Sequence, residues 1–223
     1  MMGFRPVVLG GVILALTGCG EAFQTTGFGL MSLLVSAGDA TDEGTRTLAL
    51  LDGEAFARGP AGYCVDQGAS RSDDGFAVMV GCALLSGRAA SMPTTDGFIT
   101  LQVGAGGTAS VTGSEETLRA FLETDAGKAV LGGNGAASDV TLRNVDMTPG
   151  LVTAHFDDAS LGSELGLEPR LWQGFLDLNG RMATVTVRSF ARNPLGARDG
   201  TALLNATISE IRAANASIAA PDG

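Results

Sequence analysis

His155 is the only histidine in this chain of 223 residues, so metal or proton-transfer chemistry that needs an imidazole must use it. If residues 151–157 form a strand, Thr153, His155 and Asp157 share one face, because side chains alternate along a strand. His155, Asp157 and Asp158 are therefore candidates for a small cation site. The alternative is a solvent-facing strand side on which Asp158 begins a turn. Since one histidine cannot build a multi-histidine centre, we expect no metal and no other cofactor.

Nucleophilic catalysis has few candidate residues. The chain has no Gly-x-Ser-x-Gly motif, and a Ser-His-acid triad would have to use His155. Lys128 is the only lysine and has no serine three residues before it. The adjacent carboxylates at 73–74 and 115–116 suit a loop tip and a helix start better than a pair that flanks a substrate. We therefore predict no catalytic residues and a protein that is not an enzyme.

Residues 104–109, Gly-Ala-Gly-Gly-Thr-Ala, match a variant of the dinucleotide-binding glycine motif. That motif requires a helix to begin at once, so that its N-terminus faces the pyrophosphate. Here the β-prone residues 110–112 intervene before a helix expected at Ser114. We interpret the glycines as a hairpin loop between strands at 98–103 and 108–112.

The N-terminus carries Arg5, an apolar run at 7–16 and then Leu-Thr-Gly before Cys19. The run is too short for a membrane span, which needs about 20 residues, but suits a signal peptide. The Leu-Thr-Gly-Cys sequence resembles the lipobox of bacterial lipoproteins. The resemblance implies that residues 1–18 are removed and that Cys19 receives lipid chains that anchor the protein stably. In some bacteria, an aspartate directly after the lipidated cysteine keeps a lipoprotein in the inner membrane. This chain has Gly20 at that position, so the resemblance implies an anchor in the outer membrane, at its periplasmic face.

Export would place the two remaining cysteines in an oxidising compartment. Two β-prone runs flank the turn signal Asp74-Gly75, and an antiparallel hairpin with Cys64 opposite Cys82 would have its tip at Asp73. We predict a Cys64–Cys82 disulfide worth about 3 kcal/mol. A redox role is the alternative, but such sites usually have a Cys-x-x-Cys spacing.

Composition limits the partners. The formal net charge of −10 argues against nucleic acid and against electrostatic binding to anionic lipid heads. The expected partners are the membrane, through the lipid on Cys19, and either an unknown envelope protein or a small ligand. The expected organisation is a signal peptide at 1–18, a tether at 19–27, one domain at 28–215 and a tail at 216–223.

Periodicity predicts an α+β domain in which two or three helices pack on an antiparallel sheet with one disulfide-linked hairpin. Asn179-Gly180 predicts a tight hairpin, and alternation predicts that Ala183, Val185 and Val187 face the core. The single tryptophan, Trp172, is expected in the core. The expected strands are 45–51, 98–103, 108–112, 140–145, 151–156, 171–178 and 181–190. The expected helices are 115–124, a turn at 129–131, and a last helix from Asp199 or Thr201 to Asn215. Residues 53–60 are expected to form a loop, and residues 28–35 a first packed element.

The ending, two long hairpin strands and one helix, resembles the PsbP-like α/β sandwich lipoproteins. This resemblance implies a non-enzymatic envelope protein. We expect an interaction or assembly role, and the alternative is a small-ligand-binding module with a pocket between sheet and helix. The alternatives differ in structure, because a ligand module needs a preformed pocket of at least about 300 Å³. An assembly protein needs a contiguous exposed apolar patch instead.

Overall fold

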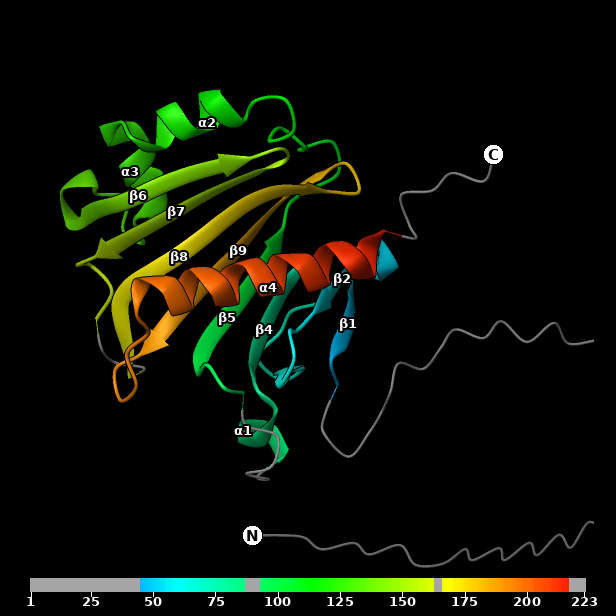
Figure 1. Ribbon diagram of the computed structural model, residues 1–223. Helices are drawn as coiled ribbons and strands as arrows, with labels where there is room; N and C mark the ends of the chain where they lie inside the picture. The colour runs from blue at the N-terminus through cyan, green and yellow to red at the C-terminus, as the bar shows by residue number, and fades with distance from the viewer. Residues whose placement is uncertain (1–44, 87–92, 163–165, 217–223) are drawn as a thin grey trace, which may run out of the picture. The chain divides into compact units, whose positions relative to one another are not determined.

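The computed structural model describes residues 45–86, 93–162 and 166–216, all within one compact unit (Figure 1). A seven-stranded antiparallel sheet has the order β3-β4-β5-β9-β8-β7-β6, and β1 and β2 form a separate hairpin. The predicted α+β class is confirmed. The strands are β1 (Thr47–Leu50), β2 (Ala55–Arg58), β3 (Tyr63–Val65), β4 (Phe76–Gly81), β5 (Gly97–Val103), β6 (Val140–Thr148), β7 (Leu151–Asp158), β8 (Leu167–Leu178) and β9 (Arg181–Phe190).

The described ranges contain four α-helices, and two of these helices cover one face of β6 and β7. They are α1 (Cys82–Ser86), α2 (Glu115–Leu122), α3 (Asp125–Leu131) and α4 (Ala197–Asn215). Figure 1 shows α4 lying across the sheet, where it contacts β8, β9 and β2. None of the helices in the described ranges is long and apolar enough to cross a membrane. The predictions for residues 1–18, Cys19, the tether, the element at 28–35 and the tail from 217 onward lie outside these ranges.

Strand alternation divides the apolar residues into two cores. Under α4 lie Leu151 of β7 and Trp172 of β8, whereas Val152 and Phe156 of β7 lie under α2 and α3. Because successive side chains point to opposite faces, the two sets of helices cover opposite faces of the sheet. The i, i+4, i+7 spacing of Leu204, Ile208 and Ile211 predicts one apolar face on the last helix, and all three residues are buried in the first core.

The β8–β9 hairpin forms as the sequence predicted. Asn179 and Gly180 both have positive φ, 49° and 76°, which is the conformation that a two-residue hairpin turn requires. The register that follows puts Ala183, Val185 and Val187 into the core with no exposed surface. Local turn chemistry therefore sets the register of the central strands.

The β3–β4 hairpin differs in register from the prediction. Cys64 pairs with Val80 rather than Cys82, and Cys82 begins α1. The turn still ends at Gly75, which has φ 68°, and Arg71 pairs with Phe76 across it. A second turn, closed by the Ser70 N–H on the Asp66 carbonyl, adds residues to the first arm and shifts the register of β3 against β4. Cys82 nevertheless reaches Cys64, because its N–H continues the ladder to the Gly62 carbonyl.

Three further predictions about local structure were wrong. Residues 53–60 contain strand β2 instead of a loop alone, because Ala55 and Ala57 fill the space under α4. Residues 108–112 are not a strand, because the Asp177 carboxylate accepts the N–H groups of 110–112. The last helix begins at Ala197, two residues before Asp199, with Gly196 as its N-cap.

Candidate functional site

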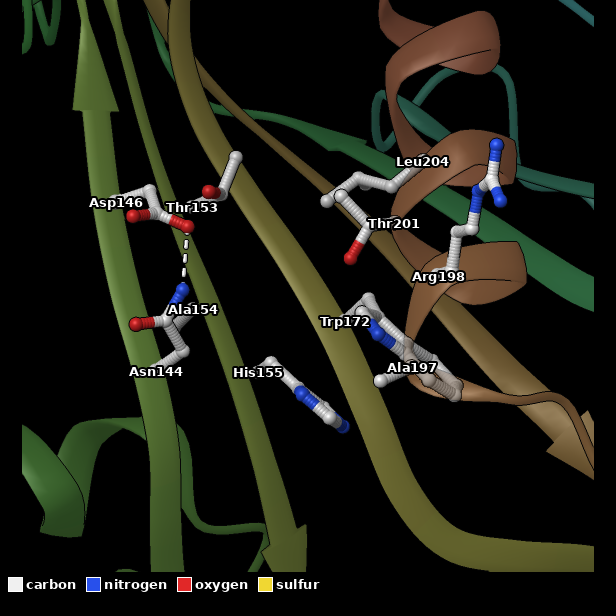
Figure 2. A pocket seen from close by; sticks show the side chains of 10 residues that line it. All are labelled: Asn144, Asp146, Thr153, Ala154, His155, Trp172, Ala197, Arg198, Thr201 and Leu204. Carbon is white, nitrogen blue, oxygen red and sulfur yellow. Dashed lines mark hydrogen bonds between the residues drawn. The ribbon is translucent and has the colours of Figure 1, made fainter.

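A pocket of about 350 Å³ lies between the sheet and the first turns of α4 (Figure 2). Its floor and one side come from β6, β7 and β8, and its other side comes from α4. The lining combines polar side chains with an apolar floor. The lining residues are Asn144, Asp146, Thr153, Ala154, His155, Trp172, Ala197, Arg198, Thr201 and Leu204.

The position of α4 explains why polar residues gather here. The helix packs chiefly on β8 and β9, and among the described residues no other helix lies on the same face of β6 and β7. On that face, Asn144 pairs with His155 and Asp146 pairs with Thr153. A register shift between Leu142 and Asn144 leaves Arg143 unpaired, so the polar residues that follow it take up these positions. The alternate residues of the same strands point the other way, into the core under α2 and α3.

Trp172 and His155 form the inner wall of the pocket. Trp172 is 1 % exposed, and the His155 ring stacks on it with centroids 4.8 Å apart and planes within 9°. Among the described residues, neither Nε1 of Trp172 nor Nε2 of His155 has a hydrogen-bond partner, although both atoms are buried. Burial of the imidazole, followed by the charge of Arg170, holds the pKa of His155 below its ordinary value. The ring is therefore neutral at neutral pH.

Two opposite charges border the pocket. The Asp146 carboxylate comes from β6 and accepts a hydrogen bond from the Asn144 amide. Arg198 comes from the first turns of α4 and is exposed. Within the ranges that the structure covers, neither Asp146 nor Arg198 forms an ion pair. The pocket thus has a negative side on the sheet and a positive side on the helix.

A second pocket of about 310 Å³ shares Asp146, Thr153 and Thr201 with the first. It adds Thr148 and Leu151 from the strands and Asn205 from α4. Through these shared residues the two pockets form one groove along α4, on the face of β6 and β7 that no other described helix covers.

The predicted cation-site residues do not come together as a ligand set. Thr153, His155 and Asp157 do share a face, as alternation predicts. Asp157, however, accepts hydrogen bonds from Arg143 at 2.6 Å and 2.8 Å, and from Arg170 at 3.2 Å. Burial raises the pKa of Asp157, but the two guanidinium groups outweigh it and hold this pKa below its ordinary value.

Asp158 lies on the opposite face from His155 and is fully buried. Its carboxylate accepts the N–H of Gly133 at 2.7 Å and the N–H and hydroxyl of Ser160 at 2.9 Å and 2.6 Å. No group of three or more histidine, cysteine or acidic side chains that could hold a metal occurs in the described ranges. Asp158 stabilises the turn after β7, as expected under the alternative to a cation site.

The predicted Cys64–Cys82 disulfide is confirmed, with the two Cα atoms 4.8 Å apart. Both residues are buried, at 0 % and 3 % exposure, so the bond joins β3 to the start of α1 inside the domain. This position fits a structural crosslink and offers no approach for a redox partner.

Sequence reasoning missed four polar residues of the pocket: Asn144, Asp146, Arg198 and Thr201. Asn144 and Asp146 could have been found from the alternation of polar and apolar residues at 144–148. There, Asn144, Asp146 and Thr148 alternate with Val145 and Met147. No local pattern indicated Arg198 or Thr201, because their role depends on where α4 crosses the sheet. Trp172 lies in the core as predicted, but it also lines the pocket.

No family model and no curated protein matches the chain. Among solved structures, a point mutant of the protein Mog1 has a TM-score of 0.41 at 12% identity, covering 75% of this chain and 93% of that one. The Saccharomyces cerevisiae Ran-binding protein Mog1p has a TM-score of 0.41 at 12% identity, covering 75% of this chain and 92% of that one. Similarity at this level is too low to support an inference about function.

Proposed function

We propose that this protein is a lipid-anchored, non-enzymatic binding protein of the cell envelope, whose α+β domain holds a small ligand in the groove beside α4. The observation that carries the proposal is the pocket of about 350 Å³ between sheet and helix. Small-molecule sites commonly have volumes of about 300 to 1,000 Å³ and a few polar groups over an apolar floor. This pocket has that size, and its lining combines polar side chains with the apolar surfaces of Trp172 and Leu204.

The pocket favours a ligand-binding module over a protein-assembly surface. The exposed large apolar side chains of the described residues lie on four different elements: α1, α2, α3 and β6. They are Leu84, Leu85, Phe121, Val130 and Met147. The pocket, in contrast, gathers side chains from three adjacent strands and one helix at a single place.

The proposal gives His155 a binding role. Within the described part of the chain, His155 stacks on Trp172, and its buried Nε2 has no partner. The nearby carboxylate of Asp157 is occupied by two arginines. The imidazole is thus placed as a wall of the pocket.

The anchor rests on the lipobox-like sequence that ends at Cys19. Its test is expression of the full chain in bacteria with radiolabelled palmitate, followed by membrane fractionation. We expect label and membrane recovery for the natural chain, and loss of both for Cys19→Ser. The double variant Cys64→Ala/Cys82→Ala is the matched control and should keep the label. Label that persists in Cys19→Ser would overturn the lipid anchor.

The binding role is tested by native mass spectrometry of the full chain extracted from its own envelope. We expect a copurifying small molecule, and we expect Thr201→Phe to displace it by filling the groove. Ser209→Phe, at an exposed position of the same helix, is the control that should retain it. A protein that carries no small molecule, or one that Thr201→Phe does not displace, would contradict a ligand site in this groove.

A further inference from the structure

Arg198 stands out among the basic side chains of the domain. Every other described arginine, and Lys128, forms an ion pair or donates a hydrogen bond, whereas Arg198 does neither with any described residue. The domain has an excess of acidic groups that could have paired with it. Its guanidinium is therefore available at the α4 side of the pocket.

The inner wall beside it contains a buried donor. An indole N–H can only donate a hydrogen bond, and leaving a buried donor unpaired costs about 1–3 kcal/mol. Figure 2 shows the indole nitrogen of Trp172 on the edge of the ring that faces the space between α4 and the sheet. An acceptor bound at this wall could take the indole N–H, and Arg198, which lines the same pocket from α4, could supply a positive charge. A carboxylate has the matching chemistry.

The opposite side of the pocket has the opposite sign. Asp146 lies on β6 with Thr153 beside it, and its carboxylate is exposed. The only hydrogen bond to it from a described residue comes from Asn144, so it keeps acceptor capacity for a ligand. An ammonium group on the ligand would complement this side.

The geometry points to a ligand with both charges: we propose that the pocket binds a small zwitterion of amino-acid size. Its carboxylate is held by Arg198 and Trp172, and its ammonium group is held by Asp146. This assignment rests on the proposed binding function and specifies its ligand class. A singly charged ligand would complement the charge on only one side of the pocket.

The test uses the fluorescence of Trp172, which is the only tryptophan of the chain. The full chain in detergent is titrated with the twenty standard amino acids and with glycylglycine. We expect at least one of these probes to change the emission saturably. The N-acetyl derivative of that probe, which lacks the ammonium group, and its amide, which lacks the carboxylate, should each bind at least tenfold more weakly.

Two variants separate the two ends of the ligand. Arg198→Gln should weaken the amino acid at least tenfold and remove its advantage over the amide. Asp146→Asn should remove its advantage over the N-acetyl derivative. Arg119→Gln, on α2 at the opposite face of the sheet, is the matched control and should leave the affinity unchanged.

The proposal is overturned if no probe binds, or if the singly charged derivatives bind as tightly as the amino acid. These failures are distinguishable from failure of the binding function itself. A copurifying molecule that Thr201→Phe displaces, together with no response to the panel, would mean that the groove binds a ligand of another class. Absence of both would remove the binding function as well.

Discussion

Gly200 of α4 lies directly on the indole of Trp172, so closely that a Cβ atom at this position would overlap Cδ2, Cε2 and Cζ2 of the ring. Glycine inside a helix costs about 1 kcal/mol relative to alanine. The close approach that it permits seats the first turns of α4 on β8 and brings Arg198 and Thr201 to the edge of the pocket. One residue without a side chain therefore allows α4 to approach the Trp172 wall of the candidate site this closely.

Gly200→Ala is expected to destabilise the protein by about 1–3 kcal/mol, because the added methyl group must displace the indole or the helix. Helix propensity alone would predict the opposite change, because alanine stabilises a helix relative to glycine. Urea unfolding followed by circular dichroism measures the change. Ser209→Ala, exposed on the same helix, is the control and should shift the unfolding free energy by less than about 0.5 kcal/mol. A Gly200→Ala protein as stable as the parent would show that the contact is not close.

The stacked pair of the only histidine and the only tryptophan provides a pH probe. Burial, and then the charge of Arg170, lowers the pKa of His155 from 6.5. We expect the emission of Trp172 to change with a midpoint below pH 6.5, because an imidazolium on the indole face interacts with its π-system. Since the folded state favours the neutral ring, stability contributed by this group is present above pH 6.5 and is lost as the pH falls through the lowered pKa.

A fluorescence titration from pH 8 to pH 4 tests this expectation, with His155→Gln as its control. The variant should lack the transition. A midpoint at or above 6.5, or the same transition in the variant, would contradict the assignment.

Asp177 fastens the segment before α2 to the sheet. Its carboxylate accepts the N–H groups of Ser110, Val111 and Thr112 at 3.0 Å, 3.1 Å and 2.7 Å. Burial raises the pKa of Asp177, but these hydrogen bonds outweigh burial and hold it below 3.8. The stability that depends on its charge is therefore full above pH 3.8 and is lost as the pH falls through the lowered pKa.

Asp177→Asn should lower the unfolding free energy at pH 7 by about 1–3 kcal/mol, because charge-assisted hydrogen bonds are lost. The difference between variant and parent should shrink as the pH is lowered below 3.8. Urea unfolding at several pH values measures both effects. The exposed Asp125→Asn should cost less than about 1 kcal/mol at pH 7, since Asp125 forms only a surface ion pair. A pH-independent loss in Asp177→Asn would refute the role of the charge.

Asn215, at the end of α4, holds the β1–β2 hairpin. It is 3 % exposed, and its amide accepts the N–H of Phe56 at 2.9 Å and donates to the Phe56 carbonyl at 2.8 Å. Asn215→Ala should cost about 2–3 kcal/mol, because it leaves two backbone groups of β2 without partners. Asn205→Ala, exposed on the same helix, should cost less than about 0.5 kcal/mol. Hydrogen exchange should show faster opening of β2 only in the first variant, and unchanged exchange there would contradict the role.

The disulfide closes a loop of 18 residues between two buried positions. Cys64→Ala/Cys82→Ala should therefore lose about 3 kcal/mol of unfolding free energy, chiefly because the unfolded chain gains conformational freedom. Urea unfolding measures the loss, and a thiol count on denatured, unreduced protein provides the control. Two free thiols in the natural protein would contradict the crosslink.

Local patterns in the sequence were sufficient for much of the fold. The Asn179-Gly180 turn predicted its hairpin correctly, because a two-residue turn with positive φ has few alternatives. The stripe of Leu204, Ile208 and Ile211 predicted the last helix and its buried face. The prediction for 108–112 failed, because these β-prone residues are held by Asp177, which is distant in the sequence.

The sequence by itself determined the α+β class, the central hairpin and the pairing of Cys64 with Cys82, since each depends on neighbouring residues or on a count of one residue type. The lipid anchor on Cys19 remains a prediction of the same kind. Only the tertiary structure decided where the pocket lies. Asp146 and Arg198 are 52 positions apart in the numbering, and no periodicity connects them. They border the same pocket because Gly200 lets α4 lie on Trp172, while no other helix of the described residues lies on the neighbouring face of β6 and β7.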